Sequence, residues 1–388
     1  MKKYALMMLL LYSLLQASTA NVIAQVQIVV MNALKLERKN EIVAVPWDEV
    51  KKHIPQANPK SISLTHLQSG GTLVFQAVDE NNDGVVDVFL FLDDFKAGET
   101  KSYLLKQGAR ERAEGKSRTD ARFMMPREDL AWENDRIAFR MYGPALAAEV
   151  NNGIDVWCKR VRSLVIEQWY KDDESKVRSY HEDHGEGADF FSVGRTLGGG
   201  SSALWNGDSL SQPGVFESYT ILATGPLRAM FELTFKPVQY NGKPVREVRR
   251  ITLDAGQNLN RIDIVYSGEP NALTFAAGVV KRKGTTSTVN NTNQWISLYG
   301  LTTEQEVNGY LGTGAVLSGA SFREIREDDT HVLILGTATT GKPVTYYSGG
   351  GWTRSGDFNN QMDWERYLDE YAVRLKAPLL VRVSEEEQ

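Results

Sequence analysis

Short runs in which apolar and polar residues alternate recur along the chain after residue 24. Runs of this kind, ended by Gly, Pro or Asn, are typical of half-buried β-strands. They occupy residues 25–30, 61–64, 72–76, 249–253, 259–266, 274–280, 331–335 and 344–347. Helical spacing of apolar residues is confined to residues 47–53 and 362–375. The pattern therefore predicts a mostly β protein with two helices.

Turn residues separate the predicted strands at the spacing of long antiparallel sheets. These turns are expected at residues 151–153, 241–244 and 254–256. Between residues 107 and 120 the sequence becomes charged and small, which is typical of an exposed connection. We therefore expect a smaller N-terminal β unit over residues 21–110 and a large antiparallel β-sandwich over residues 120–388.

Residues 1–20 have the three parts of a cleavable secretory signal. Met1-Lys2-Lys3 supplies a positive start, and residues 4–15 form an apolar run that is too short to span a bilayer. Ser18-Thr19-Ala20 then places small side chains before a cleavage site, with Ala24 as a second option. We expect export to the periplasm, in a form that begins near residue 21 and has no membrane anchor.

The net charge disfavours one class of partner, and the cysteine content excludes one source of stability. The formal net charge of −5 becomes −7 when Lys2 and Lys3 leave with the signal, so nucleic acid is an unfavourable partner. Cys158 is the single cysteine. The chain can therefore form no internal disulfide, and no lipid-attachment cysteine follows the signal, so packing must supply the stability.

Residues 179–189 form the most unusual stretch and contain His181 and His184. Because the stretch is rich in Gly and charge, it cannot build a core and presents its imidazoles from a loop. Imidazole titrates near neutral pH, and neighbouring carboxylates can orient it for proton transfer. A divalent metal bound by His181 and His184 with Glu186 or Asp189 is an alternative, and so is a solvated loop without a function.

Residues 79–87 space oxygen-bearing side chains as calcium-binding loops do, with Gly84 at the sharp turn. The twelfth position of such a loop is Leu90, which has no carboxylate, and strands rather than helices flank the stretch. A plain hairpin turn is the favoured interpretation.

Aromatic residues and arginines near predicted strand ends supply candidate sugar contacts, because a pyranose ring stacks on an aromatic plane. Trp205, Tyr346 and Trp352 are candidates for such stacking, and the glycines between Tyr347 and Trp352 would let a ligand approach the backbone closely. Trp132, Trp157 and Trp169 are expected to pack the sandwich instead. Three arginines near Gly or Pro could each bind a carboxylate through two N–H groups, and these are Arg140, Arg195 and Arg228.

Several motifs, taken in order along the chain, resemble a family of secreted proteins of unknown function from polysaccharide-utilisation loci, which includes an ulvan oligosaccharide dehydratase. The motifs are residues 32–38, Gln76, Asp83-Gly84, Asp87, Met141-Tyr142-Gly143-Pro144, residues 181–187, Asp189, Gly194-Arg195, residues 346–352 and Asp363-Trp364. The resemblance implies a galactose-mutarotase-like β-sandwich. It also implies removal of water from a non-reducing-end uronic acid, which creates a C4–C5 double bond in an acidic oligosaccharide.

Such an elimination needs a cation on the carboxylate, a base at C5 and an acid for the departing oxygen. The resemblance assigns Arg195, helped by Arg140, to the carboxylate, His184 to the base, and His181 or Tyr142 to the acid. Trp205, Tyr346 or Trp352 would form the sugar platform. The two histidines could exchange these roles, and no cofactor is expected unless a divalent metal binds His181, His184 and Asp189.

Two other classes of function remain open. A sugar mutarotase or epimerase would use the same fold with a histidine acid and a carboxylate base, and a non-catalytic carbohydrate-binding protein would need only the aromatic residues. The oligomeric state is not addressed by the sequence.

Overall fold

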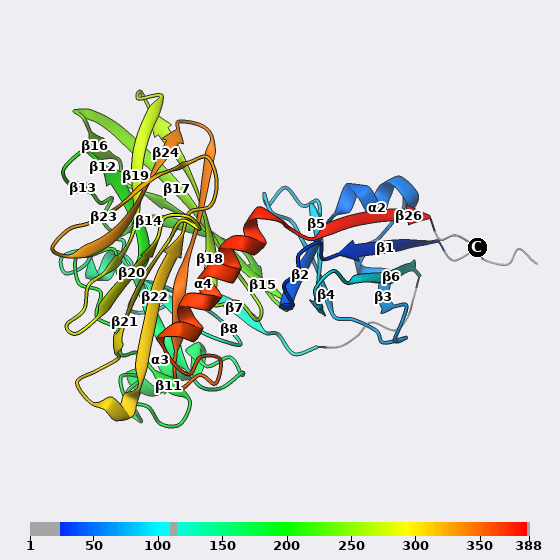
Figure 1. Ribbon diagram of the computed structural model, residues 1–388, viewed down its shortest axis with the longest axis horizontal. Coiled ribbons are helices and arrows are strands. Elements are labelled where there is room, and N and C mark those ends of the chain that lie inside the picture. The colour runs from blue at the N-terminus through cyan, green and yellow to red at the C-terminus, as the bar shows by residue number, and fades with distance from the viewer. Residues whose placement is uncertain (1–23, 109–114, 386–388) are drawn as a thin grey trace, which may run out of the picture.

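The computed structural model describes residues 24–108 and 115–385 (Figure 1). In these residues antiparallel strands form five sheets, which confirms the all-β class and the large sandwich with a smaller N-terminal β unit. Helices α2 (Trp47–His53) and α4 (Gln361–Lys376) match the two predicted helices, whereas α3 (Ile166–Glu174) lies where no helix is expected. None of the described helices is long and apolar enough to cross a membrane. The predicted signal at residues 1–20 lies outside the described residues.

Two small sheets pack face to face in the N-terminal unit. One has the strand order β26 (Leu380–Glu385), β1 (Gln25–Met31), β6 (Thr100–Gln107) and β3 (Ile62–His66), and the other β2 (Arg38–Pro46), β5 (Val88–Phe95) and β4 (Phe75–Val78). Alternate residues of these strands, such as Val26, Ile28, Phe89 and Leu105, fill the core between them. Strand β26 comes from the far end of the chain and pairs with β1 in antiparallel register, although the expected division placed the two strands in different units (Figure 1).

A nine-stranded sheet forms one side of the main sandwich. Its order is β14 (Phe216–Thr224), β15 (Arg228–Phe235), β17 (Lys243–Asp254), β18 (Leu259–Gly268), β25 (Pro343–Trp352), β22 (Tyr310–Val316), β21 (Trp295–Leu301) and β20 (Thr286–Asn290), with β16 (Val238–Tyr240) paired to β17. The predicted turns at residues 241–244 and 254–256 connect β16 to β17 and β17 to β18.

Two five-stranded sheets cover the other side of the core. The first has the order β13 (Leu210–Ser211), β12 (Gly199–Trp205), β19 (Ala272–Val280), β24 (His331–Thr339) and β23 (Phe322–Glu327). The second has the order β11 (Gly187–Ala188), β10 (Ile154–Lys159), β9 (Ala138–Met141), β8 (Asp129–Asn134) and β7 (Thr119–Met124). Apolar residues from all three sheets, among them Phe139, Phe231, Ile262, Phe275 and Ile334, meet in one large core.

The loop at residues 79–87 joins β4 to β5 as a hairpin, as expected. Both carboxylate oxygens of Asp79 accept hydrogen bonds from backbone N–H groups of the same loop, from Asn81 and Asp83 at 3.2 Å and from Gly84 at 2.7 Å. Asp79, which would be the first ligand of a calcium loop, therefore stabilises the turn through hydrogen bonds to its backbone.

Helix α4 lies across the nine-stranded sheet and leads into β26 (Figure 1). Asn360 caps the helix by accepting the Asp363 N–H at 3.0 Å. The fully buried Trp364 sits over Gly312 and Gly351, and a Cβ on Gly351 would lie 2.6 Å from the Trp364 ring. The glycines of β25 thus admit protein side chains, not a ligand, which corrects the expectation for this segment.

Trp364→Ala should lower the free energy of unfolding by about 3–5 kcal/mol, because it leaves a cavity between α4 and the glycine surface of the sheet. Urea unfolding measures this. The matched control is Met362→Ala on the same helix, where the side chain is 66% exposed and the expected change is within about 0.5 kcal/mol. Equal losses in the two variants would contradict this packing.

Candidate functional site

The outer face of the sheet that contains β8, β9 and β10 is covered by α3 and the chain that follows it. Period-2 alternation in β9 sends Phe139 and Met141 into the large core and Arg140 to the outer face. Strand pairing places Asp155 of β10 directly opposite Arg140. Trp157 of β10 packs there against Trp169 and Tyr170 of α3 in a second, smaller core.

Arg140 is the centre of a buried hydrogen-bonded group that we call the Arg140 cluster. Its members are Arg140, Asp129, Asp155, Asp189, Tyr142, Tyr170, Tyr180 and His181. The guanidinium donates to Asp155 Oδ2 at 2.6 and 3.0 Å, to Asp189 Oδ2 at 2.8 Å, and to the hydroxyls of Tyr142 at 2.8 Å and Tyr180 at 3.0 Å. Every guanidinium nitrogen of Arg140 therefore has a partner.

Three carboxylates surround this one guanidinium and are almost fully buried. Arg140 lies 3.8 Å from Asp129, and Tyr170 donates a hydrogen bond to the same Asp129 oxygen at 2.9 Å. The second oxygens of Asp129 and Asp155 have no hydrogen-bond partner among the described residues. Because burial of unbalanced charge is costly, such a group marks a functional-site candidate more than a stabilising one.

The electrostatics of the cluster favour protonated acids. Burial raises the pKa of Asp129 to about 6. Burial, together with the charge of Asp155, raises the pKa of Asp189 well above its ordinary value. Burial and the same Asp155 charge also raise the pKa of Tyr142, so its phenol keeps its proton at neutral pH and donates a hydrogen bond to Asp155 Oδ2 at 3.2 Å.

His181 lies at the accessible edge of the cluster, with 59% of its side chain exposed. Its Nδ1 is 3.1 Å from the backbone carbonyl of Asp189 and 3.5 Å from the Asp189 carboxylate. A carbonyl oxygen only accepts, so Nδ1 carries the proton of this hydrogen bond. In the neutral ring Nε2 is then the unprotonated nitrogen, which makes it available as a base.

The structure brings together four of the residues singled out in the sequence, namely Arg140, Tyr142, His181 and Asp189. His184 makes no hydrogen bond or ion pair with the cluster in the described residues, since its Nε2 lies 3.2 Å from the Ser179 carbonyl and 4.0 Å from Glu182. Arg195 is exposed and donates to the Ala148 carbonyl.

The described part of the chain contains no group of side chains that could serve as the ligands of the alternative metal site. No three His, Cys, Asp or Glu residues within residues 24–108 and 115–385 are grouped so that they could hold an ion. His181 and His184 turn toward different backbone carbonyls, those of Asp189 and Ser179, which is why the predicted set with Asp189 does not converge.

The structure corrects the proposed sugar platform. Tyr346 is 0% and Trp352 2% exposed, because alternation along β25 turns both rings into the large core, where a pyranose cannot reach them. Trp205 belongs to a separate apolar cluster on β12 and lines a different hollow, with Tyr240 and Arg326. The expectation that Arg140 helps to bind the substrate carboxylate is also wrong. Each of its guanidinium nitrogens already donates within the cluster, so none is left for a substrate.

Sequence reasoning missed Asp129, Asp155, Tyr170 and Tyr180. A signal existed for two of them, since Asp129 and Asp155 each stand directly before a run of three apolar residues in their strands. The spacing of Ile166, Trp169 and Tyr170 is also that of a helix face, and it could have predicted α3.

Asp129→Asn should flatten the pH dependence of stability. The folded-state pKa of Asp129 is raised from 3.8 to about 6, so the folded wild type binds more protons than the unfolded chain in that window. Its stabilising effect is therefore present at low pH and is lost as the pH rises through about 6. From about pH 4 to about pH 7 the variant should lose about 2 kcal/mol less unfolding free energy than the wild type.

Urea unfolding across this pH range checks the result. Asp208→Asn, in an exposed turn, is the control and should follow the wild-type curve. Parallel curves for Asp129→Asn and the wild type would contradict a buried, protonated Asp129.

The chain is similar in sequence and in fold to known proteins. The chain is 28% identical over 374 residues to "Uncharacterized protein P7" of Formosa agariphila, covering 92% of this chain and 93% of that protein. A solved glycosyl hydrolase family 38 protein from Enterococcus faecalis superposes with a TM-score of 0.52 at 10% identity, over 94% of this chain and 48% of that one. An alpha-mannosidase from E. faecalis V583 gives a TM-score of 0.43 at 9% identity, over 94% and 46%.

The chain spans about half the length of these two solved proteins, and the first likeness shows a shared fold. A family model described as a domain of unknown function, DUF4861, matches residues 30–381. That match covers nearly the whole described chain, from β1 to β26. The protein is therefore a member of the DUF4861 family.

Proposed function

We propose that this protein is a carbohydrate-active enzyme that eliminates water across C4–C5 of a non-reducing-end uronic acid in an acidic oligosaccharide. One observation carries the proposal. The Arg140 cluster holds a protonated phenol, Tyr142, and an imidazole with an available nitrogen, His181, within one hydrogen-bonded group that has an accessible edge. These are the acid and the base that an elimination requires.

In the proposed reaction His181 Nε2 removes the C5 proton. The electron pair of the C5–H bond forms the C4–C5 double bond, and the C4–O4 bond breaks. The departing oxygen takes the proton of Tyr142 and leaves as water. The Arg140 guanidinium, 2.8 Å from the Tyr142 oxygen, stabilises the phenolate that forms, and the proton on His181 returns to the phenolate through solvent.

Neutralising the uronate carboxylate is the remaining requirement, because the C5 proton is poorly acidic beside a charged carboxylate. We assign this role to Arg195. It is exposed, and its hydrogen bond to the Ala148 carbonyl ties it to the segment that follows Tyr142. A guanidinium held by one bond keeps further N–H groups for a substrate.

The base assignment differs from that implied by family resemblance, which favoured His184. The contact between His181 and Asp189 supports His181, because Asp189 also accepts from Arg140 and so links the imidazole to the phenol. His184 has no such link. We further propose that the enzyme works in the periplasm, after removal of the predicted signal.

His181→Ala and Tyr142→Phe should each lower kcat by about 10²–10⁴, the usual contribution of a positioned acid or base. The assay incubates the protein with saturated uronic-acid oligosaccharides and follows the ultraviolet absorbance of the conjugated product. His184→Ala is the matched control, since it removes an imidazole from the same loop, and it should keep kcat within about threefold of wild type.

A fully active His181→Ala variant would remove this residue from the mechanism, and loss of activity only in His184→Ala would restore the alternative base. Product analysis by NMR separates the other classes. An anomer or epimer without absorbance indicates a mutarotase or epimerase, and binding without turnover indicates a carbohydrate-binding protein. Activity that survives chelation would exclude a required, removable metal.

A further inference from the structure

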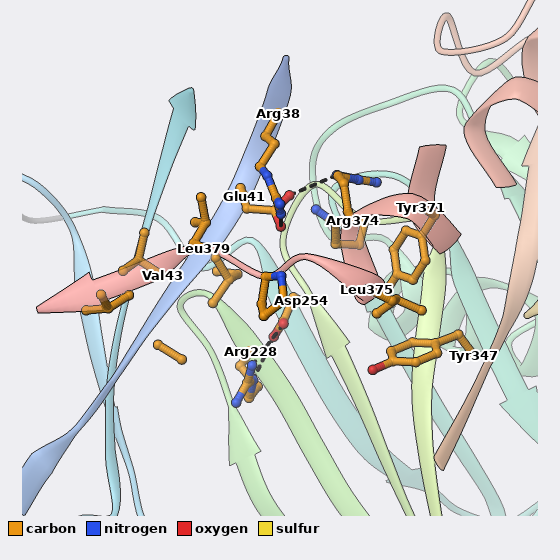
Figure 2. Close-up of a pocket in the computed structure, with 15 residues that line it drawn as sticks. Arg38, Glu41, Val43, Arg228, Asp254, Tyr347, Tyr371, Arg374, Leu375 and Leu379 are labelled. Carbon is orange, nitrogen blue, oxygen red and sulfur yellow. Dashed lines mark hydrogen bonds and ion pairs between the residues drawn. The ribbon is translucent and has the colours of Figure 1, made fainter. Parts of the chain in front are cut away.

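A pocket of about 400 Å³ lies where the N-terminal unit, the nine-stranded sheet and α4 meet (Figure 2). Three distant parts of the chain build it: residues 38–44 of β2, the ends of β15 and β17 with Gln257, and residues from Tyr347 to Val381. Its volume is in the usual range for small-molecule sites, and junctions between structural units are common places for them.

Positive charge is in excess on the α4 side of the pocket. Arg38 and Arg374 both donate to Glu41, at 2.9 and 2.8 Å, so two guanidinium groups share one carboxylate. On the opposite side Arg228 forks Asp254 at 2.7 and 2.9 Å and balances it (Figure 2). Glu80, 3.4 Å from Arg228, adds negative charge only at that side and does not line the pocket.

Several polar groups of the pocket are without protein partners. The Arg374 side chain is 11% exposed, and its buried Nε makes no hydrogen bond in the described residues. The hydroxyls of Tyr347 and Tyr371, both partly exposed lining residues, make no hydrogen bond within the described chain and are open to a ligand. Because buried donors are normally satisfied, Arg374 Nε indicates a missing partner.

The shape of the pocket suits a sugar ring. The rings of Tyr347 and Tyr371 meet edge to face at 5.3 Å and lie on one side, while Val43 and Leu379 lie on the other (Figure 2). Aromatic planes with hydroxyls at their rim can contact both the C–H face and the hydroxyls of a pyranose.

We propose that this pocket is a second binding site, which takes one anionic sugar residue. Its carboxylate or sulfate group is bound by Arg374, and its ring packs against Tyr347 and Tyr371. Planar guanidinium groups pair with both kinds of anion. Excess positive charge beside an unpartnered Nε and two free hydroxyls carries the proposal.

The second site is separate from the Arg140 cluster. Asn134, at the end of β8, donates to the carbonyl of Asp254 at the pocket wall, whereas Asp129 of the cluster begins the same strand. Five residue steps along a strand separate the two sites by about 16 Å. Binding at the pocket therefore does not depend on the proposed elimination.

The test is calorimetric titration of the whole protein with methyl glucuronide, glucose 6-sulfate and methyl glucoside. Wild type should bind at least one of the anionic sugars about tenfold more tightly than the neutral one, and the comparison of the two anions tells carboxylate from sulfate. Arg374→Gln should weaken that binding about tenfold or more, and Tyr371→Phe severalfold.

Arg366→Gln is the matched control, because it makes the same change on an exposed part of α4, where the side chain is 60% exposed, and it should leave the affinity unchanged. Tyr142→Phe, in the Arg140 cluster, reports whether the bound sugar lies there instead. Thermal unfolding checks that each variant folds. If Arg374→Gln does not fold, the affinity of Tyr371→Phe alone tests the second site.

Three results would overturn the second site. The first is no binding of either anion, and the second is equal binding of the neutral sugar. The third is an affinity that falls with Tyr142→Phe and not with the pocket variants, which would place the bound sugar at the Arg140 cluster. The deciding readout is the affinity change in Arg374→Gln and Tyr371→Phe relative to Arg366→Gln, so a failed elimination assay does not affect it.

Discussion

Antiparallel pairing between β1 and β26 joins the two ends of the described chain in one sheet. Because β26 must reach β1, the preceding chain has to cross the nine-stranded sheet, and α4 makes that crossing. The crossing is possible because Gly312, Gly314 and Gly351 leave room for Trp364 and Leu368. The smaller unit is thereby held against the sandwich, and the junction between them becomes a pocket.

The two candidate sites differ in how they treat buried charge. In the Arg140 cluster three carboxylates face one fully occupied guanidinium, so the excess is negative and favours protonated acids at its edge. In the pocket at the unit junction two guanidinium groups share Glu41, so the excess is positive and favours an anion. The negative excess is the basis of the proposed proton transfer, and the positive excess is the basis of the proposed anion binding.

Local patterns predicted the β class, part of the strands and two of the helices. Period-2 alternation indicated strands such as β1, β18 and β19, and helical spacing indicated α2 and α4, because both signals arise from contacts between near neighbours. The Gly-rich and charged composition of residues 179–189 also predicted an exposed imidazole, and His181 lies at the edge of the cluster. Tyr346 and Trp352 were misjudged because an aromatic residue beside glycines gives no sign of which face of its strand is covered.

The sequence by itself determined the all-β class, the positions of the hairpins and the loop that presents His181, since these depend on alternation, turn residues and composition within a few positions. Only the tertiary structure decided that Asp155 lies opposite Arg140, that α3 buries this pair, and that Glu41 meets Arg374 from the other end of the chain. The physical reason is that burial and charge pairing depend on which surfaces pack together, and strand alternation offers two faces without choosing between them.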